Sequence, residues 1–258
     1  MIQKIENKIE ELQEMSKYPS ELYYLGNQSL LKKRKISIIG TRRPSTYTKE
    51  FTYKLSSKLS SQNICIVSGA AMGVDSIAHQ GAGYSNTIAV VANGLDIRYP
   101  SINKNLISNI ENNGLMLSAY KPGEKARNYT FVLRNEIVTA LGEILIVTEA
   151  DLKSGSLTSV NYALKMGKKV YTLPHRLNES LGTQDLIQKS LITPIYDIDK
   201  FIEEISGKEI NKRINDEILL YCSSNPSYDE AVSKYASKIF EYELEGKIKI
   251  ENGKITVI

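Results

Sequence analysis

Three short loops in the sequence combine glycine with hydroxyl or arginine side chains, a composition suited to holding phosphate. They are Gly40-Thr41-Arg42-Arg43, Ser68-Gly69 and Ser154-Gly155-Ser156-Leu157-Thr158. Glycine lets the backbone approach an oxyanion closely, and nearby amides or hydroxyls can then donate to it. Arginine adds a planar fork that binds phosphate at two oxygens. Because a glycine after a strand is often only a tight turn, the prediction of an anion site rests on all three loops together.

The elements around these loops predict that they share one location. Short apolar runs recur along the chain and each ends in a polar turn; they cover residues 36–39, 64–67, 87–91, 115–117, 144–147 and 169–173. Helical segments separate them, the first over about 47–60. Runs that are apolar on both faces are typical of strands buried between two helix layers. The alternation predicts an α/β fold, an extended Rossmann-like, doubly wound, mostly parallel sheet, whose ligands bind beyond the carboxyl ends of the strands.

The chain divides into three predicted parts. Residues 1–30 form a short N-terminal extension, in which Ile5, Ile9 and Leu12 favour a helix over 1–18 that ends at Pro19, before a strand at 23–26. Residues 31–206 form the Rossmann-like domain. Residues 210–258 carry an expected helix over 211–223 and one or two more over 228–244, then a hairpin whose turn contains Asn252-Gly253. Helices followed by one hairpin predict a small winged-helix-like C-terminal domain.

Composition and charge narrow the class of protein. Hydrophobic residues make up 41% and charged residues 24% of the 258, as in ordinary soluble globular proteins, and no apolar run suggests a membrane span. The N-terminus carries no evident export signal, and Cys65 and Cys222 suggest neither a disulfide framework nor a zinc site. We therefore expect a cytoplasmic protein with no membrane partner, metal or cofactor. Residues 31–206 contain 22 Lys or Arg and 15 Asp or Glu, a net +7 that is compatible with nucleic acid.

Further motifs fall in a fixed order along the predicted sheet. No dinucleotide GxGxxG and no GxxxxGK[ST] phosphate loop is present. Instead the chain contains Ile39-Gly40-Thr41-Arg42, Val67 through His79, Asn93-Gly94-Leu95-Asp96 with Tyr99-Pro100, Phe131 with Arg134-Asn135, Ser154 through Thr158, and Gly182 through Ile187. In type and order these segments, which span about residues 23–195, resemble the DNA-processing protein DprA (Smf) family. The C-terminal part resembles the winged-helix appendage of that family.

The resemblance implies a function. It implies a single-stranded DNA-binding recombination mediator that protects incoming DNA and loads the RecA recombinase during natural transformation. It also implies a homodimer formed through the α/β domain, and no catalytic activity. Double-stranded DNA is a further candidate ligand.

The expected DNA-binding residues come from the loops and from the segment around Phe131. Arg42 would hold phosphate, while Phe131 either stacks on a base or packs under a helix start. Arg134 either contacts phosphate or structures its loop with Asn135, and Lys121, Lys125 and Arg127 are candidates to line a backbone groove. The predicted set is Gly40, Thr41, Arg42, Arg43, Ser68, Gly69, Lys121, Arg127, Asn128, Phe131, Arg134, Asn135, Ser154, Gly155, Ser156 and Thr158.

Two replacements distinguish this sequence from the family pattern. Met72 stands where an arginine is usual, and Glu136 ends the segment that is usually "R-N-R". We expect Glu136 to remove a positive charge near the proposed groove. Asp75 and His79 are interpreted as hydrogen-bonding residues that shape the second loop, rather than as an acid or a base.

Two other functions are compatible with parts of the sequence. One is a nucleotide-binding, phosphoribohydrolase-like enzyme of the lysine-decarboxylase-like group, which resembles the same sheet. Those enzymes carry a PGGxGTxxE segment with a chemically active glutamate, and the corresponding region here is Ser154 through Thr158. The other is a duplex-reading role for the C-terminal part. Its candidate second and third helices, with the residue that follows them, contain Glu230, Glu241, Glu243 and Glu245 against Lys234 and Lys238, a poor balance for a major-groove helix.

Overall fold

The computed structural model describes residues 1–207 and 216–257. The chain forms two compact units, Met1–Lys208 and Glu209–Ile258. We call them the α/β unit and the C-terminal unit. The residues of the predicted N-terminal extension pack within the α/β unit.

A nine-stranded sheet runs through the α/β unit in the order β1-β2-β6-β5-β4-β3-β7-β8-β9. Strands β3 to β9 pair in parallel, and β1 and β2 add an antiparallel edge beside β6. The predicted Rossmann-like, mostly parallel sheet is confirmed, and each of the six predicted apolar runs forms a strand. The strands are β1 (Gln3–Lys4), β2 (Tyr23–Gly26), β3 (Lys35–Ile39), β4 (Cys65–Ser68), β5 (Thr87–Val91), β6 (Leu115–Ser118), β7 (Leu145–Val147), β8 (Val170–Thr172) and β9 (Thr193–Pro194).

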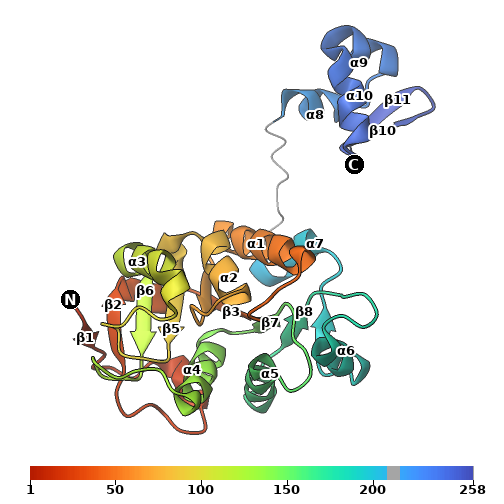
Figure 1. The fold of residues 1–258 in the computed structure, drawn as a ribbon. Helices are drawn as coiled ribbons and strands as arrows, with labels where there is room; N and C mark the ends of the chain where they lie inside the picture. Colours follow the sequence, from red (N-terminus) through yellow and green to blue (C-terminus); the bar gives the residue numbers. More distant parts are fainter. Residues whose placement is uncertain (208–215, 258) are drawn as a thin grey trace. The chain divides into compact units, whose positions relative to one another are not determined.

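Helices cover both faces of this sheet (Figure 1). They are α1 (Thr46–Ser61), α2 (Val74–Ala82), α3 (Lys104–Asn113), α4 (Asn128–Leu141), α5 (Gly155–Lys165), α6 (Leu181–Gln188) and α7 (Ile198–Ser206). The strand order steps from β3 through β4 and β5 to β6, and in the opposite direction from β7 through β8 to β9. Right-handed crossovers in opposite directions place α1 to α3 on one face and α4 to α6 on the other. The order therefore reverses between β3 and β7, where open sheets of this kind bind ligands.

The core explains why these runs form strands. Every residue of β3 to β8 is buried, as expected when helices cover both faces. Helix α1 is held against α2 by Gly81, where a Cβ would lie 2.6 Å from the carbonyl oxygen of Tyr53. The sheet is consequently a rigid frame for the loops at its edges.

The helix predicted over residues 1–18 is wrong. Residues 3–4 form β1, and a 3₁₀ helix, η1 (Glu10–Glu14), follows. The apolar spacing favours a helix, but the backbone of this segment forms hydrogen bonds with a neighbouring segment instead. Strand β1 pairs with β2, and the Ile5 amide donates to the Leu22 carbonyl at 2.8 Å. Ile9 and Leu12 are still buried, because they pack into the hydrophobic core of the α/β unit.

Two lysines with buried side chains hold η1 at the amino edge of the sheet. Lys35 Nζ lies 2.6 Å from Glu11 Oε1 and donates to the Leu31 carbonyl at 2.7 Å. Lys168 Nζ lies 3.0 Å from Glu14 Oε2 and donates to the Gly142 carbonyl at 2.8 Å. Buried charges need such partners, so these contacts fix the N-terminal segment against the sheet.

The C-terminal unit contains α8 (Glu217–Cys222), α9 (Tyr228–Tyr235), α10 (Ser237–Leu244), β10 (Ile248–Glu251) and β11 (Lys254–Val257). The predicted hairpin is confirmed: Glu251 pairs with Lys254, and Asn252 and Gly253 take φ of 52° and 73°, as a primed turn requires. The stretch predicted as helical over 228–244 breaks at Ala236 (φ 50°). Residues 211–215 of the other predicted helix lie outside the described residues.

Candidate nucleic-acid interface

The loops after β3 and β7, together with the start of α4, enclose a groove of about 450 Å³ at the carboxyl edge of the sheet. The groove lies at the point where the strand order reverses, and the first residues of α4 and α5 line it. Helix N-termini present unpaired amides and a partial positive charge, which favours anions. Most of the predicted residues meet there: Gly40, Thr41, Arg42, Asn128, Phe131, Arg134, Asn135, Ser154, Gly155, Ser156 and Thr158.

The loop after β3 uses its own backbone groups for structure. The Thr41 amide donates to the Glu149 carbonyl at 2.8 Å, and the Arg43 amide donates to Thr41 Oγ1 at 3.2 Å. The Thr41 carbonyl accepts from the Val74 amide at 3.1 Å, and a Cβ on Gly73 would lie 2.4 Å from that carbonyl oxygen. The amides of Thr41 and Arg43 are therefore occupied, and the exposed Arg42 side chain is the charged group that this loop places at the groove.

Two arginines lie near the ring of Phe131. The guanidinium carbons of Arg42 and Arg134 lie 5.5 Å and 5.6 Å from the centroid of the Phe131 ring. Both distances are within the range of cation–π attraction. Arg42 is exposed, whereas Arg134 is buried, and the ring itself is partly exposed. Phe131 thus packs on the protein and still faces the groove, so its two predicted roles are compatible.

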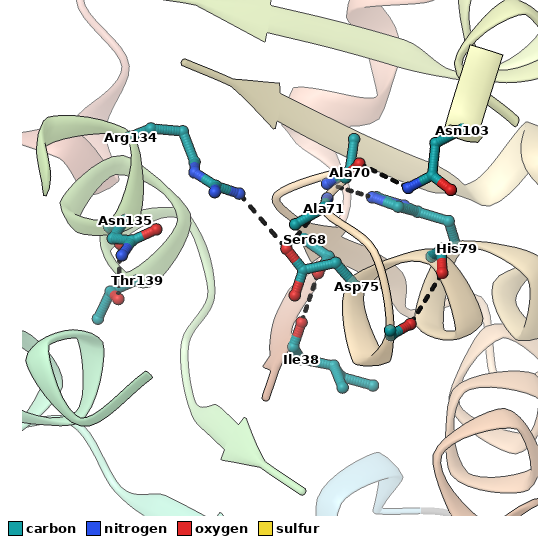
Figure 2. Close-up of polar contacts among 12 residues, drawn as sticks. Ile38, Ser68, Ala70, Ala71, Asp75, His79, Asn103, Arg134, Asn135 and Thr139 are labelled. Carbon is teal, nitrogen blue, oxygen red and sulfur yellow. Dashed lines mark hydrogen bonds and ion pairs between the residues drawn. The ribbon is translucent and has the colours of Figure 1, made fainter. Parts of the chain in front are cut away.

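Arg134 belongs to a buried ion pair (Figure 2). Its Nη1 lies 3.4 Å from Oδ2 of Asp75, and both side chains are more than nine-tenths buried. Gly69 makes room for the guanidinium, because a Cβ there would lie 1.2 Å from Nη1. Burial raises the pKa of the Asp75 carboxyl, and the Arg134 charge opposes this rise. Arg134 therefore structures the loop after β4, through Asp75.

His79 holds the same loop from the other side, in a fixed tautomer. Thr87 Oγ1 donates to the Ile66 carbonyl at 2.8 Å, so His79 Nδ1, 2.7 Å from that oxygen, must be the donor. Nε2 then accepts from the Ala70 amide at 3.3 Å. Burial lowers the pKa of His79 to about 3, so the ring stays neutral. Its predicted hydrogen-bonding role is confirmed, and Asn103 completes the loop by donating to the Ala70 carbonyl at 3.0 Å (Figure 2).

Five residues of the predicted set do not line the groove. Ser68 is buried and donates to the Ile38 carbonyl at 2.6 Å, and Gly69 lies against Arg134. Lys121 Nζ is 3.4 Å from Glu21 Oε2, so part of its charge is already paired. Arg43 and Arg127 are exposed, and no carboxylate of the described residues lies within 4.0 Å of either. These two cations remain available to a ligand that extends beyond the groove.

The expectation that Glu136 removes positive charge near the groove is wrong. Glu136 is buried and is not among the groove residues. Its Oε1 accepts from both the amide and the hydroxyl of Ser16, each at 2.9 Å. The side chain points toward the N-terminal segment because residue 136 lies on a different side of α4 from Arg134 and Asn135. The sequence offered no signal for this contact, which joins residues 120 positions apart.

Sequence reasoning also missed Tyr99. Its ring is 46% exposed and lies 6.3 Å from that of Phe131, between ring centroids. The Tyr99-Pro100 motif by itself indicates no role for the ring. Among residues 1–207 and 216–257 no cluster of His, Cys, Asp and Glu is suited to hold a metal ion, and no helix is long and apolar enough to span a membrane.

This fold and site define a class: a Rossmann-like protein whose switch-point groove is lined by two helix N-termini, an exposed arginine and an aromatic ring. Residues 6–206 match the sequence model described as DNA recombination-mediator protein A. The chain belongs to this family, which confirms the resemblance found in its motifs.

Individual relatives and solved structures agree with this family membership. The chain is 37% identical over 194 residues to the DNA processing protein DprA of Streptococcus pneumoniae, covering 73% of this chain and 68% of that protein. It is 32% identical over 197 residues to the DNA processing protein DprA of Bacillus subtilis, covering 74% and 66%. The match to the protein Smf of Synechocystis spans 46% of that protein, so some relatives are considerably longer.

Two solved structures distinguish similarity within the family from similarity of the fold alone. The structure of DNA processing protein A from Helicobacter pylori, described for its single-stranded DNA binding mode, superposes with a TM-score of 0.78 at 39% identity, covering 79% of this chain and 95% of that one. The molybdenum cofactor binding protein from Rippkaea orientalis gives a TM-score of 0.50 at 19% identity, covering 68% and 96%. The latter likeness shows a shared fold alone.

Proposed function

We propose that this protein is a recombination mediator that binds single-stranded DNA along the carboxyl-edge groove, protects incoming DNA and loads RecA recombinase during natural transformation. The observation that carries the proposal is the pair of Arg42 and Phe131. An exposed guanidinium 5.5 Å from a partly exposed ring offers one contact for a phosphate and one for a base. The solved Helicobacter pylori relative, described as a single-stranded DNA binder, supports it.

The test is a fluorescence-anisotropy titration of oligothymidine against salt, comparing wild type with Arg42→Ala. We expect the variant to bind roughly 10-fold more weakly and the slope of log K against log salt to fall by about 0.7, the value for one phosphate contact on a single strand. Equal affinity of the variant and wild type across the salt range would contradict a phosphate role for Arg42.

Arg34→Ala is the matched control. Arg34 precedes β3 at the opposite end of the strand that leads to Arg42, and it pairs with Glu143 away from the groove. We expect this variant to keep the wild-type salt slope. Duplex DNA of the same sequence and a nucleoside monophosphate competitor are added as further arms. Preference for the duplex, or displacement of DNA by micromolar monophosphate, would instead favour duplex binding or the nucleotide-enzyme alternative.

The homodimer and the winged-helix assignment belong to the same proposal. Exposed Leu181, Leu191 and Tyr196 (43%, 45% and 81%) lie near β9, the last strand of the sheet, and an apolar edge of this kind is suited to a second copy. A change to a monomer in Leu191→Glu, measured by light scattering, would support this face. For residues 210–258, three short helices and a hairpin favour a winged-helix-like domain.

A further inference from the structure

Helix α1 has an aromatic and basic side that lies outside the groove. Tyr47, Phe51 and Lys54 follow one another along the helix at spacings of four and three residues, which places them on one side of it, and none of them lines the groove. We call this side the α1 strip. We propose that the α1 strip binds the part of a single DNA strand that leaves the groove, with a nucleobase stacked on the ring of Tyr47. The inference rests on the proposed function and adds a second contact surface for the same ligand.

The ring of Tyr47 is held by its neighbours and still reaches the surface. Its centroid lies 4.7 Å from that of Phe51 and 5.7 Å from that of His175, whose ring stands nearly edge-on to it at 73°. His175 Nε2 donates to the Thr148 carbonyl at 2.8 Å, which fixes the histidine ring beside the end of β7. Tyr47 nevertheless remains 37% exposed. Because the ring is ordered in advance, it loses little conformational freedom when a base stacks on it.

The charges around the strip attract a phosphate backbone. Residues 43–57 contain three cations and one carboxylate, a net +2. Arg43 and Lys54 are both exposed, and no carboxylate of residues 1–207 and 216–257 lies within 4.0 Å of either. Lys54 Nζ lies 5.9 Å from the centroid of the Phe51 ring, so the cation is held beside the aromatic pair. The carboxylate at the start of α1, Glu149, is already engaged, because it accepts from the amide and hydroxyl of the capping serine at 3.0 and 3.1 Å.

The strip continues the groove. Arg42 lines the groove and Arg43 does not, so the loop after β3 forms the border between the groove and α1. A strand that crosses this border meets cations in the loop, then the ring of Tyr47, then the charge of Lys54 about 10 Å further along the helix. Rings alternating with cations suit single strands, because their bases are free to stack on protein, whereas those of a duplex are already paired and stacked.

The first experiment measures binding of the full chain to oligothymidine as a function of strand length. Anisotropy titrations cover lengths from about 4 to about 20 nucleotides, a range that includes the usual site sizes of single-strand binders. We expect Tyr47→Ala to weaken binding of the longest strands roughly 5- to 150-fold, the range for loss of one stacked base, and to leave the shortest strands, which occupy only the groove, unchanged. Tyr47→Phe keeps the ring and should retain the wild-type affinity at every length.

Two further variants test the charge and the location. Lys54→Ala should lower the salt slope by about 0.7, the value for one phosphate contact, on long strands only. Tyr53→Ala is the matched control, since Tyr53 is 50% exposed on the same helix but lies six residues from Tyr47 and therefore on a different side. We expect Tyr53→Ala to bind strands of every length as wild type does.

The second experiment detects stacking directly. The chain contains no tryptophan, so Tyr47→Trp introduces a single indole fluorophore at the strip. Long oligothymidine should quench its emission, because a stacked base quenches an indole, whereas a strand of the same length with tetrahydrofuran in place of each nucleoside should not. The emission of Tyr53→Trp should be unchanged by either strand. This measurement also covers the case in which Tyr47→Ala fails to fold.

The outcomes separate the α1 strip from the proposed function. If oligothymidine binding depends on salt and on Arg42, but Tyr47→Ala changes it at no length or the emission of Tyr47→Trp does not respond, the strip is wrong and the function stands. Absence of salt-dependent binding in wild type would overturn both. Equal quenching of Tyr47→Trp and Tyr53→Trp would mean that the strand contacts α1 without a defined site, which also contradicts the strip.

Discussion

Gly69 and Arg134 occupy complementary space: a side chain on Gly69 would begin 1.2 Å from Nη1 of Arg134. The missing Cβ is what lets the guanidinium of α4 reach Asp75 across the loop after β4. The glycine that sequence reasoning assigned to phosphate binding therefore admits an arginine of the protein itself. Through Arg134 it also supports the position of Phe131 at the groove.

Substituting Gly69 should be costly. In Gly69→Ala the new Cβ displaces the Arg134 guanidinium, which leaves Asp75 buried without its counter-charge, and breaking a buried pair costs about 3–5 kcal/mol. We expect a loss of that order in the free energy of unfolding, measured by urea denaturation. Gly155→Ala is the control, since its Cβ would meet nothing closer than Asn135 Nδ2 at 3.9 Å. Equal midpoints for the two variants would refute the packing role of Gly69.

His79 should make the fold sensitive to acid. Its pKa is about 3 in the folded state and near 6.5 when unfolded. Between these values the unfolded chain binds the additional proton, so stability is lost as the pH falls from about 6.5 toward 3, by roughly 2 kcal/mol at pH 5. His79→Gln should flatten the profile of unfolding free energy over pH 5–7.5 relative to wild type. His175→Gln replaces the other histidine of the chain and should keep the wild-type profile.

Glu136 should contribute to stability and not to DNA binding. Glu136→Ala removes the acceptor of two hydrogen bonds from Ser16, and we expect a loss of about 2 kcal/mol in unfolding free energy. Faster hydrogen exchange at the Ser16 amide would report the same contact. The affinity for oligothymidine and its salt slope should stay at wild-type values. Tighter binding of oligothymidine by this variant would instead indicate that the Glu136 charge acts at the groove.

The groove should work without the C-terminal unit. Each residue that lines it belongs to the α/β unit, which is compact by itself. Deleting residues 209–258 should therefore leave the affinity for oligothymidine within about threefold of the full chain, a change below 1 kcal/mol. If the truncated protein keeps its circular dichroism spectrum and its urea midpoint yet no longer binds, the principal site lies in the C-terminal unit.

The fold could be read from the sequence where local signals were strong. Strands such as β5 are runs of apolar residues closed by a glycine-containing turn, so their pattern marks both their type and their end. Short elements carried no such signal: β9 has two residues, and η1 is set by contacts with buried lysines distant in the chain. Tertiary partners decided these cases, and residue spacing does not report them.

In the candidate site, too, local sequence signals predicted some features and tertiary contacts decided the others. The loops could be placed at one edge because parallel strands align their carboxyl ends, and Arg42 and Phe131 do lie together there. The pairing of Asp75 with Arg134 joins residues 59 apart, and its geometry depends on how α4 crosses β4. For the same reason Tyr99 was not placed beside Phe131. The sequence indicates which loops converge, whereas packing decides which side chains remain exposed to a ligand.

The contact of Thr41 with Gly73 has an evolutionary consequence. The carbonyl of Thr41 accepts from the amide of Val74, and Gly73, at φ 80°, has no room for a side chain beneath that carbonyl. The turns after β3 and β4 are therefore inherited as one unit, although more than thirty positions separate them. Among homologues we expect position 73 to tolerate another residue only where the backbone at 41–42 has also changed, so the two turns should covary.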